Sequence, residues 1–412
     1  MRENKTESSD EKRVYIDYNA TTPLKPEVKA AMTGDLDIFG NASSLHASGR
    51  HAHARVEEAR AMVEKLLGAQ PHTVIFTSGG SESNNMVFET MRQLACDIKG
   101  CIRQRGSRVA ESCSKGRYEI ITTEIEHPCV YNSARFLQNH GLKVTFLPVD
   151  TCGKLQIETL KKALNEKTLF VSVMAANNEI GTIQNIREIS ALVKAAGAWM
   201  HSDAVQAVGK IPVTVDDLGV DYLTVSSHKI YGPKGVGALY VRSGAPVFPL
   251  IQGGHQENGM RAGTYNNLGI IGFGRAAAIA AGEVLHYGKE IAPLRNRLRD
   301  GLLASIPAIK VNGHPEDVLP NTLNISFPGA EGEAILLSMD IAGIEASTGS
   351  ACASGSLEPS HVLTAIGVGP ELAHGSIRFS LGWGINADDI DYIIKTLPPI
   401  IARLRAMGGN NV

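Results

Sequence analysis

The stretch Thr168-Leu-Phe-Val-Ser-Val-Met-Ala175 precedes an amphipathic segment, Ile186-Arg-Glu-Ile-Ser-Ala-Leu-Val-Lys-Ala195, and then a second apolar stretch, Ala198-Trp-Met-His-Ser202. The two apolar stretches are short, which predicts strands that are buried on both faces. The amphipathic segment between them predicts a helix that covers one face of a sheet. A strand, a helix and a strand in this order predict an α/β fold with parallel strands.

The same alternation extends through the first two thirds of the chain. Further strands are expected at Thr73–Thr77, Tyr118–Thr123, Lys143–Pro148, Tyr222–Ser226 and Val236–Val241. Further helices are expected at Arg55–Leu67, Glu82–Ala95, Asn132–Gln138 and Ile157–Leu164. The pattern predicts a mostly parallel, seven-stranded sheet with helices on both faces. Reactive groups in such a sheet gather at the carboxyl ends of the strands, so the loops after the strands are where a site is expected.

The alternation stops near residue 268, and an α+β pattern follows. Helices are expected at Leu268–Leu285, Ile291–Ile306, Glu331–Ile341 and Ser360–Ile366, with strands at Asn321–Phe327 and Ser376–Leu381. The last helical segment, Ala387–Met407, contains Pro398-Pro399, which are expected to break it in two. We therefore expect a large domain over 25–268 and a smaller α+β domain formed by 1–24 and 269–412. The basic segment Cys96–Arg117 is interpreted as a surface insertion.

The composition excludes several classes of protein. A chain of 412 residues with 43% apolar residues, 20% charged residues and a net charge of −2 predicts a soluble globule with no nucleic-acid or membrane partner. The polar N-terminus lacks the apolar core of a secretory signal, so a cytoplasmic location is expected. Six cysteines are few for this length and suit a reducing compartment. Their spacing is not Cys-x-x-Cys, so we predict no metal site.

Lys229 lies in Ser226-Ser-His-Lys-Ile-Tyr-Gly, directly after a predicted strand. A lysine at this place suits a Schiff base with pyridoxal phosphate, which requires an amine brought partly out of its protonated state. Alternatively, Lys229 is a solvated surface lysine, which is the commoner situation for any one lysine. The interpretation therefore depends on the side chains that the neighbouring loops supply.

Two of those loops carry groups that fit the same cofactor. In His201-Ser-Asp-Ala-Val-Gln206, Asp203 suits a protonated pyridine nitrogen, and Gln206 suits the phenolic oxygen. In Thr77-Ser-Gly-Gly-Ser81, the backbone amides at a helix start and the hydroxyl groups form a cup for a phosphate. Taken singly, Asp203 is as well explained as a helix cap and the Gly-Gly turn as an ordinary connection.

Three further residues follow or lie within predicted strands. His127 suits stacking on the cofactor ring and proton transfer, Asn178 follows a buried strand, and Arg378 suits a substrate carboxylate. Alternatively, they are a structural histidine, a turn asparagine and a partner in a salt bridge. Because the lysine, the aspartate, the phosphate loop and the histidine all follow strands of one sheet, their joint placement favours the cofactor interpretation.

Ser347-Thr-Gly-Ser-Ala-Cys-Ala-Ser-Gly355 places a lone cysteine, Cys352, among small residues, where a thiol can move instead of packing in a core. This loop resembles that of the cysteine desulfurases of the housekeeping and nitrogen-fixation type, as do Asp17-Tyr-Asn-Ala-Thr-Thr-Pro23, Arg261-Ala-Gly-Thr264 and the motifs around Lys229 and Asp203. The cysteine desulfurases are pyridoxal-phosphate enzymes of the class V aminotransferase family, with fold type I. The similarity extends from about Val14 to Met407.

The resemblance implies a role for each matching position. Lys229 would be the Schiff-base lysine, Cys352 the nucleophile that forms a persulfide, and His127 the ring that stacks on the cofactor and assists proton transfer. The remaining implied contacts are to the pyridine nitrogen (Asp203), the phenolic oxygen (Gln206, Asn178), the phosphate (Gly80, Ser81, Ser226, Ser227, His228), the partner subunit's phosphate (Thr264) and the substrate (Arg378 at its carboxylate, and Asn178). The substrate would be L-cysteine, the product L-alanine, and the active unit a homodimer.

The sulfur would leave on an acceptor protein, either an iron–sulfur scaffold or a relay for thiolation. A selenocysteine lyase of the same fold is the principal alternative, although its cysteine loop reads differently from the loop around Cys352. A desulfurase-like binding protein without activity leaves Lys229, Asp203 and Cys352 unexplained, and an ordinary aminotransferase leaves the cysteine loop unexplained.

Overall fold

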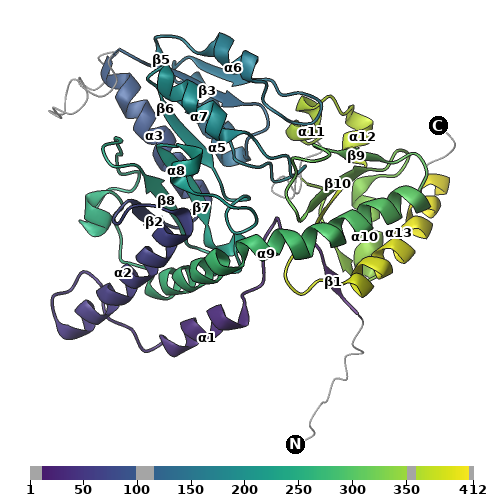
Figure 1. Cartoon of the computed structure of the whole chain (residues 1–412), viewed down its shortest axis with the longest axis horizontal. Coiled ribbons are helices and arrows are strands. Elements are labelled where there is room, and N and C mark those ends of the chain that lie inside the picture. Colours follow the sequence, from purple (N-terminus) through teal and green to yellow (C-terminus); the bar gives the residue numbers. More distant parts are fainter. Residues whose placement is uncertain (1–11, 99–115, 350–358, 408–412) are drawn as a thin grey trace, which may run out of the picture.

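The computed structural model describes residues 12–98, 116–349 and 359–407 (Figure 1). Its largest sheet has seven strands in the order β2-β8-β7-β6-β5-β3-β4. The strands are β2 (Val74–Thr77), β3 (Glu119–Thr123), β4 (Val144–Leu147), β5 (Thr168–Ser172), β6 (Trp199–Asp203), β7 (Tyr222–Ser226) and β8 (Gly237–Val241). Within this sheet β8 runs antiparallel to both of its neighbours, and the other pairs are parallel. The predicted α/β fold with a mostly parallel sheet is confirmed.

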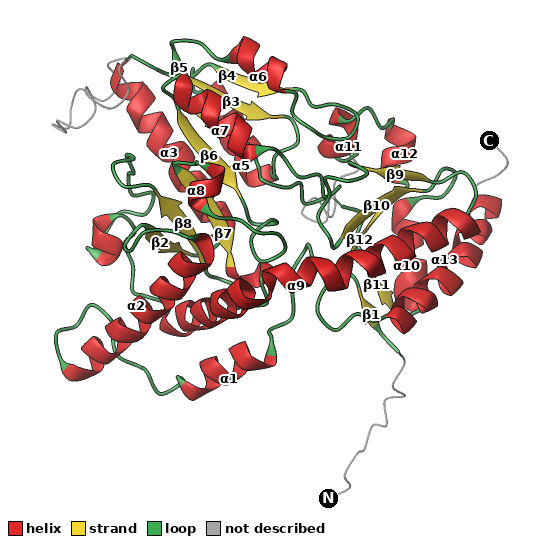
Figure 2. Ribbon diagram, viewed as in Figure 1, coloured by secondary structure: helices red, strands yellow, loops and turns green. Residues whose placement is uncertain are grey.

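Helices cover both faces of this sheet (Figure 2). Alternate strand residues enter different cores: Phe76 and Val171 pack in one, and Ile75 and Phe170 in the other, as the two-residue period of a strand requires. The helices in this part of the chain are α1 (Pro26–Gly34), α2 (Ala47–Leu67), α3 (Gly80–Ile98), α5 (Pro128–Asn139), α6 (Ile157–Ala163), α7 (Ile186–Ala195) and α8 (Val215–Leu218). Burial on both faces explains why the strands read as continuous apolar runs.

A smaller layer is built from the two ends of the chain. β1 (Val14–Tyr15) pairs in parallel with β11 (Ile344–Glu345), and β9 (Lys310–Asn312), β10 (Thr322–Ser326) and β12 (Ser376–Ser380) form an antiparallel sheet. Its helices are α10 (Gly332–Ile341), α11 (His361–Ala365), α12 (Pro370–His374) and α13 (Ala387–Met407). Ile16 from the N-terminal segment packs with Phe379 and Leu397 from the C-terminal part in one core.

The long helix α9 (Asn267–Ser305) joins the two layers, where the sequence predicted two helical segments. Residues up to Ala280 pack in a core of the large sheet, whereas Ile291 to Leu302 pack in the core of the small layer. Tertiary contacts therefore hold both ends of α9, and the segment between the two predicted helices is helical as well. α9 is long and apolar enough to span a bilayer by length and composition, but half of its most apolar window is buried inside the protein. The domain boundary at 268/269 stays a prediction.

The predicted break in the last helix is wrong, because α13 runs without interruption through Pro398 and Pro399. Proline removes a backbone donor and crowds the carbonyl one turn earlier. Here Lys395, one turn before Pro399, and Pro399 itself are exposed, so water can hydrogen-bond to the Lys395 carbonyl. Leu397 and Ile401, on the other face of the helix, are buried. Packing of the apolar face therefore outweighs the local cost.

Candidate active site

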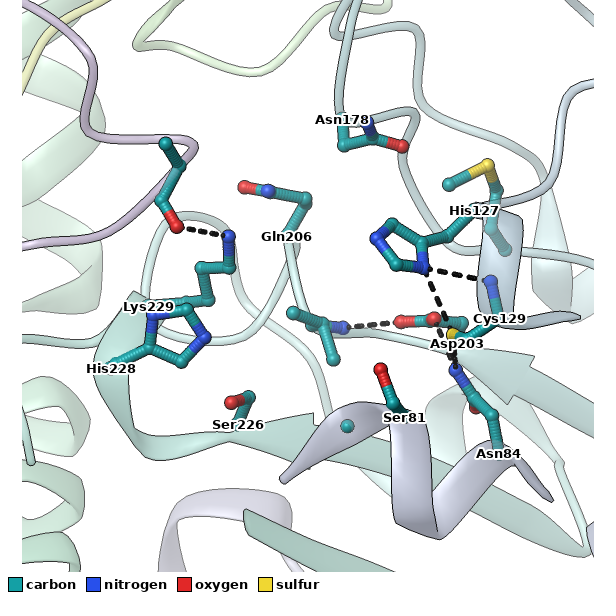
Figure 3. A pocket seen from close by; sticks show the side chains of 14 residues that line it. Ser81, Asn84, His127, Cys129, Asn178, Asp203, Gln206, Ser226, His228 and Lys229 are labelled. Carbon is teal, nitrogen blue, oxygen red and sulfur yellow. Dashed lines mark hydrogen bonds between the residues drawn. The ribbon is translucent and has the colours of Figure 1, made fainter. Parts of the chain in front are cut away.

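A cavity of about 240 Å³ opens at the carboxyl ends of the parallel strands (Figure 3). It lies where the loops after β2, β3, β5, β6 and β7 meet the N-terminal segment around Ala20. The predicted site residues that line it are Gly80, Ser81, His127, Asn178, Asp203, Gln206, Ser226, His228 and Lys229. The parallel sheet thus brings together side chains that are up to 149 positions apart in the chain (229 − 80).

Lys229 ends a short 3-10 helix, Ser227–Lys229, that follows β7 directly. Its amine Nζ donates hydrogen bonds to the backbone carbonyl oxygens of Asn19, at 2.5 Å, and Ala20, at 2.7 Å. Both acceptors belong to the segment after β1, so the N-terminal segment supplies one wall of the cavity. The amine is held at the edge of the cavity by neutral acceptors.

Asp203 is the last residue of β6 and is 5% exposed. Its Oδ2 accepts a hydrogen bond from Asn84 Nδ2 at 2.7 Å, and its Oδ1 accepts one from the backbone N–H of Val205 at 3.0 Å. These bonds fix the carboxylate in place, and no cationic side chain among the described residues forms an ion pair with it; Figure 3 shows it in the middle of the cavity. A buried carboxylate without such a cation suits a protonated ring nitrogen of a ligand.

His127 caps the start of α5. Its Nδ1 accepts the backbone N–H of Cys129 at 3.2 Å, and the Cys129 Sγ lies 2.9 Å from the same nitrogen. A backbone N–H can only donate, so the neutral imidazole carries its hydrogen on Nε2. Burial lowers the pKa of His127, and Lys229 and His361 lower it further, although Asp203 raises it. The ring is therefore neutral at pH 7 and offers a donor through Nε2.

The start of α3 and the end of β7 form a cup beside Lys229. Gly80 and Ser81 contribute the first turn of a 19-residue helix, and the side chains of Ser226 and His228 lie opposite them. Unpaired backbone N–H groups at a helix start favour an anion. A side chain at Gly237 would place its Cβ 2.7 Å from the Cα of Gly79, so glycine lets β8 approach this turn closely. The cup has the chemistry of a phosphate site.

Three of the predicted residues that the structure describes, Ser227, Thr264 and Arg378, do not line this cavity. Ser227 is fully buried beside Gly232. Thr264 lines a separate hollow, which shares Ser78 and Gly235 with the outer part of the phosphate cup. Arg378 lies behind Asn178, and Cys352 lies outside the described residues, as does most of Cys96–Arg117.

Arg378, on β12, is held by the segments around it. Its Nη2 forms an ion pair with Asp17 Oδ1 at 2.7 Å, and its Nη1 donates to the backbone oxygens of Asn178, at 3.1 Å, and Gly349, at 3.3 Å. Its Nε is buried and has no hydrogen-bond partner among the described residues. The guanidinium thus keeps one unused donor close to the cavity wall.

Asn84, Asn19, Lys210 and Cys129 were not predicted from the sequence as residues of the site. Asn84 bridges Asp203 and the Cys129 thiol, with its Nδ2 2.7 Å from the carboxylate and 3.1 Å from Sγ. The sequence contained one signal for Asn84: it is a polar residue one turn inside an amphipathic helix, and the nearby Met86 and Val87 are core residues. Asn19 and Lys210 gave no comparable signal, since their partners are distant in sequence.

Glu126, next to His127, gives a prediction about stability. Its carboxyl group is fully buried, with Oε1 accepting from the Thr123 hydroxyl at 2.6 Å and the Met174 N–H at 3.0 Å. Burial raises its pKa from 4.5 to about 8, against the lowering effect of these bonds. The folded protein therefore keeps a proton that the unfolded chain loses above 4.5. The contribution of this retained proton to the free energy of unfolding is complete below pH 4.5 and is lost as the pH rises through 8.

We expect Glu126→Gln, which keeps the Oε1 acceptor but cannot ionise, to remove this decline in the free energy of unfolding, a change on the order of a few kcal/mol across the window. Denaturant unfolding at a series of pH values measures it. Glu124→Gln, in the same loop, is the control and should leave the decline as it is. An unchanged pH dependence in Glu126→Gln would show that this carboxyl is ionised in the folded protein.

The comparisons with known proteins agree with this geometry. The family model described as "Aminotransferase class-V" matches residues 14–103 and 106–393. A protein named cysteine desulfurase IscS from Dictyoglomus turgidum is 48% identical over 401 residues, covering 96% of each chain. A protein of the same name from Methanosarcina thermophila is 43% identical, covering 97% of this chain and 95% of that protein. A solved structure titled "NifS-like protein" superposes with a TM-score of 0.84 at 37% identity, covering 95% of this chain and all of that one.

These similarities cover almost the whole chain, including the described residues that line the cavity. The expected family is confirmed, and members of it depend on pyridoxal phosphate. The chain belongs to the class-V aminotransferase family and, within it, to the cysteine desulfurases.

Proposed function

We propose that this protein is a cysteine desulfurase that converts L-cysteine to L-alanine and transfers the sulfur to Cys352 as a persulfide. The observation that carries the proposal is the convergence of Lys229, Asp203 and His127 on one cavity in a chain whose relatives are named cysteine desulfurases. The overall change balances, because the thiols of L-cysteine and Cys352 become the methyl group of alanine and a persulfide. The selenocysteine lyase alternative is not favoured by these relatives.

The residues of the cavity fit pyridoxal phosphate. Asp203 would hold the ring nitrogen, the cup around Ser81 and Ser226 would hold the phosphate, and Gln206 and Asn178 would face the phenolic oxygen. The Asn178 Oδ1 is buried without a hydrogen-bond partner among the described residues, which supports a ligand group beside it. When bound, the cofactor supplies an electron-withdrawing ring that weakens bonds at the carbon carrying the substrate amine.

Each of the chain's own site residues would then have a separate role. Lys229 would bond the cofactor at rest and, once released, would carry the α-proton on Nζ. The Nε2–H of the neutral His127 would donate a hydrogen bond into the cavity, because its Nδ1 already accepts the Cys129 N–H. The unused Nε donor supports Arg378 as the group that holds the substrate carboxylate. Cys352 would attack the substrate sulfur.

One experiment tests the proposal as a whole. The purified protein is supplied with pyridoxal phosphate and L-cysteine, and alanine and sulfide are measured with and without a thiol reductant. We expect alanine in both cases and catalytic release of sulfide only with the reductant, since the persulfide must be reduced for turnover. Alanine formation that requires a keto acid would identify an aminotransferase instead.

A homodimer is part of the proposal. Phe39, 85% exposed, and Leu45, 90% exposed, lie in the segment between α1 and α2, and we assign these two apolar side chains to the contact surface of the dimer. Gly40 of this segment accepts a hydrogen bond from Asn267, close to Thr264. Because Thr264 does not line the cavity of its own chain, it is available to reach the phosphate of the partner subunit.

We expect Phe39→Ser with Leu45→Ser to shift the protein from dimer to monomer and to reduce activity, as measured by light scattering after size exclusion and by alanine release. The matched control is Leu337→Ser with Ile341→Ser on α10, which are 66% and 86% exposed and lie in the small layer. A dimer that survives the first pair of substitutions, or a monomer with full activity, would contradict this assembly. The acceptor protein, a role in iron–sulfur cluster assembly and a cytoplasmic location stay predictions.

A further inference from the structure

Lys210 is a buried lysine behind the cavity, with 3% of its surface exposed. It follows Gln206 by four residues, and its Nζ donates to Gln206 Oε1 at 2.5 Å and to Asn19 Oδ1 at 2.9 Å. No carboxylate forms an ion pair with it within the described ranges 12–98, 116–349 and 359–407, and the charged groups that act on it, Lys229 and Arg378, are cations. A lysine buried among neutral acceptors and cations is costly, so its retention calls for a reason.

The contacts of Lys210 fix the orientation of the Gln206 amide. The other end of this amide, Nε2, donates to the backbone oxygen of Asn19 at 2.9 Å. If the amide were reversed, its oxygen would face a carbonyl oxygen and its NH₂ group would face the lysine amine. The two neighbours therefore allow one orientation, with the donor toward the side of the cavity that holds Lys229.

The same lysine also fixes Asn19. Lys210 and Asn321 Nδ2 both donate to Asn19 Oδ1, each at 2.9 Å, so the Asn19 NH₂ group turns toward Thr322. The backbone oxygen of Asn19 accepts from both Lys229 Nζ and Gln206 Nε2. Lys210 thus contacts the side chain of Asn19, whose carbonyl oxygen holds the Lys229 amine, and the side chain of Gln206, which donates to the same oxygen, although Lys210 does not itself line the cavity.

We propose that Lys210 is a positioning residue of the active site, which orients Gln206 as a hydrogen-bond donor toward the cofactor oxygen and holds Asn19 against Lys229. The proposal rests on the proposed function, because it assigns Gln206 the oxygen of a bound pyridoxal phosphate. Without Lys210 the Gln206 amide can rotate, and the negatively charged cofactor oxygen loses its hydrogen-bond donor. An oxygen that is less stabilised by a donor holds the proton it shares with the cofactor's nitrogen more strongly.

The test measures the visible absorption band of the holoenzyme against pH. We expect Lys210→Met to raise the pH midpoint of this band by about one unit, the size of one hydrogen bond. Gln206→Leu should raise it by a similar amount, and the double variant should raise it no further than either single variant. The matched control is Lys25→Met, since Lys25 is 5% exposed and pairs with Glu283, away from this network; its midpoint should equal that of the unchanged protein.

An unchanged midpoint in Lys210→Met, or a double variant whose shift is the sum of the single shifts, would overturn the proposal. Thermal unfolding of each variant separates a loss of stability from a change at the cofactor. If Lys210→Met does not fold, Lys210→Gln, which retains a donor on a shorter side chain, should shift the midpoint in the same direction by less, and no shift would again overturn the proposal. Absence of a visible band in the unchanged protein would instead contradict the proposed function.

Discussion

Lys229→Ala is expected to reduce alanine formation from L-cysteine by about 10³-fold or more, the scale seen when a covalent catalytic group is removed. The Nζ of Lys229 is the amine that the structure holds at the edge of the cavity, through the carbonyl oxygens of Asn19 and Ala20. The variant should also lose the visible band of covalently bound cofactor. Absorption spectroscopy and an alanine assay measure both effects on the same sample.

Lys194→Ala is the control, because Lys194 is exposed in the last turn of α7, just before β6 begins, and does not line the cavity at the carboxyl ends of the strands. It should retain both the band and the activity. A Lys229→Ala protein that keeps the visible band would mean that another amine holds the cofactor. Lys210, the other lysine in this network, is then the first candidate to replace in turn.

Cys352→Ala is the second substitution expected to have a large effect. The variant should keep the cofactor band, since it leaves the residues of the cavity intact, but it should form no protein-bound persulfide from L-cysteine. Labelling of persulfides after one turnover measures the loss. Cys129→Ala and Cys152→Ala are the controls, because these are the free thiols among the described residues.

Cys129 is the informative control, because its sulfur lies in the cavity, 2.9 Å from His127 Nδ1. Burial, together with the nearby Asp203, raises the pKa of its thiol to about 12. It therefore stays protonated at pH 7 and is a poor nucleophile. If persulfide persists in Cys352→Ala and disappears only when Cys129 is also replaced, then Cys129, and not Cys352, takes the sulfur.

The central sheet was predictable from sequence because parallel strands are buried on both faces and leave a short apolar signature. The strand predicted at Tyr222–Ser226 has the bounds of β7, and the helix predicted at Ile186–Ala195 has those of α7. The break at Pro398-Pro399 was wrong because burial of Leu397 and Ile401 is a tertiary effect that local rules omit. The short strands β1, β9 and β11 have two or three residues each, too few to show a period.

The cavity residues predicted from sequence are those that follow strands, because the topology alone carries them to one edge. The residues that hold them were missed for a physical reason. Asn84 contacts Asp203 across 119 positions, and Lys210 contacts Asn19 across 191 positions. Such contacts depend on how helices pack over the sheet, which no local pattern encodes. Asn19 also lies in a segment without helix or strand periodicity, where its carbonyl oxygen does the binding.

The most direct test of the account locates the transferred sulfur. The holoenzyme is mixed with one equivalent of L-cysteine, alkylated and digested, and the peptides are analysed by mass spectrometry while alanine is measured in the same sample. We predict one added sulfur atom on the peptide that contains Cys352, in amounts equal to the alanine formed, and none on the peptide that contains Cys129. Alanine formed without added sulfur on Cys352 would contradict the claim that this cysteine takes the sulfur.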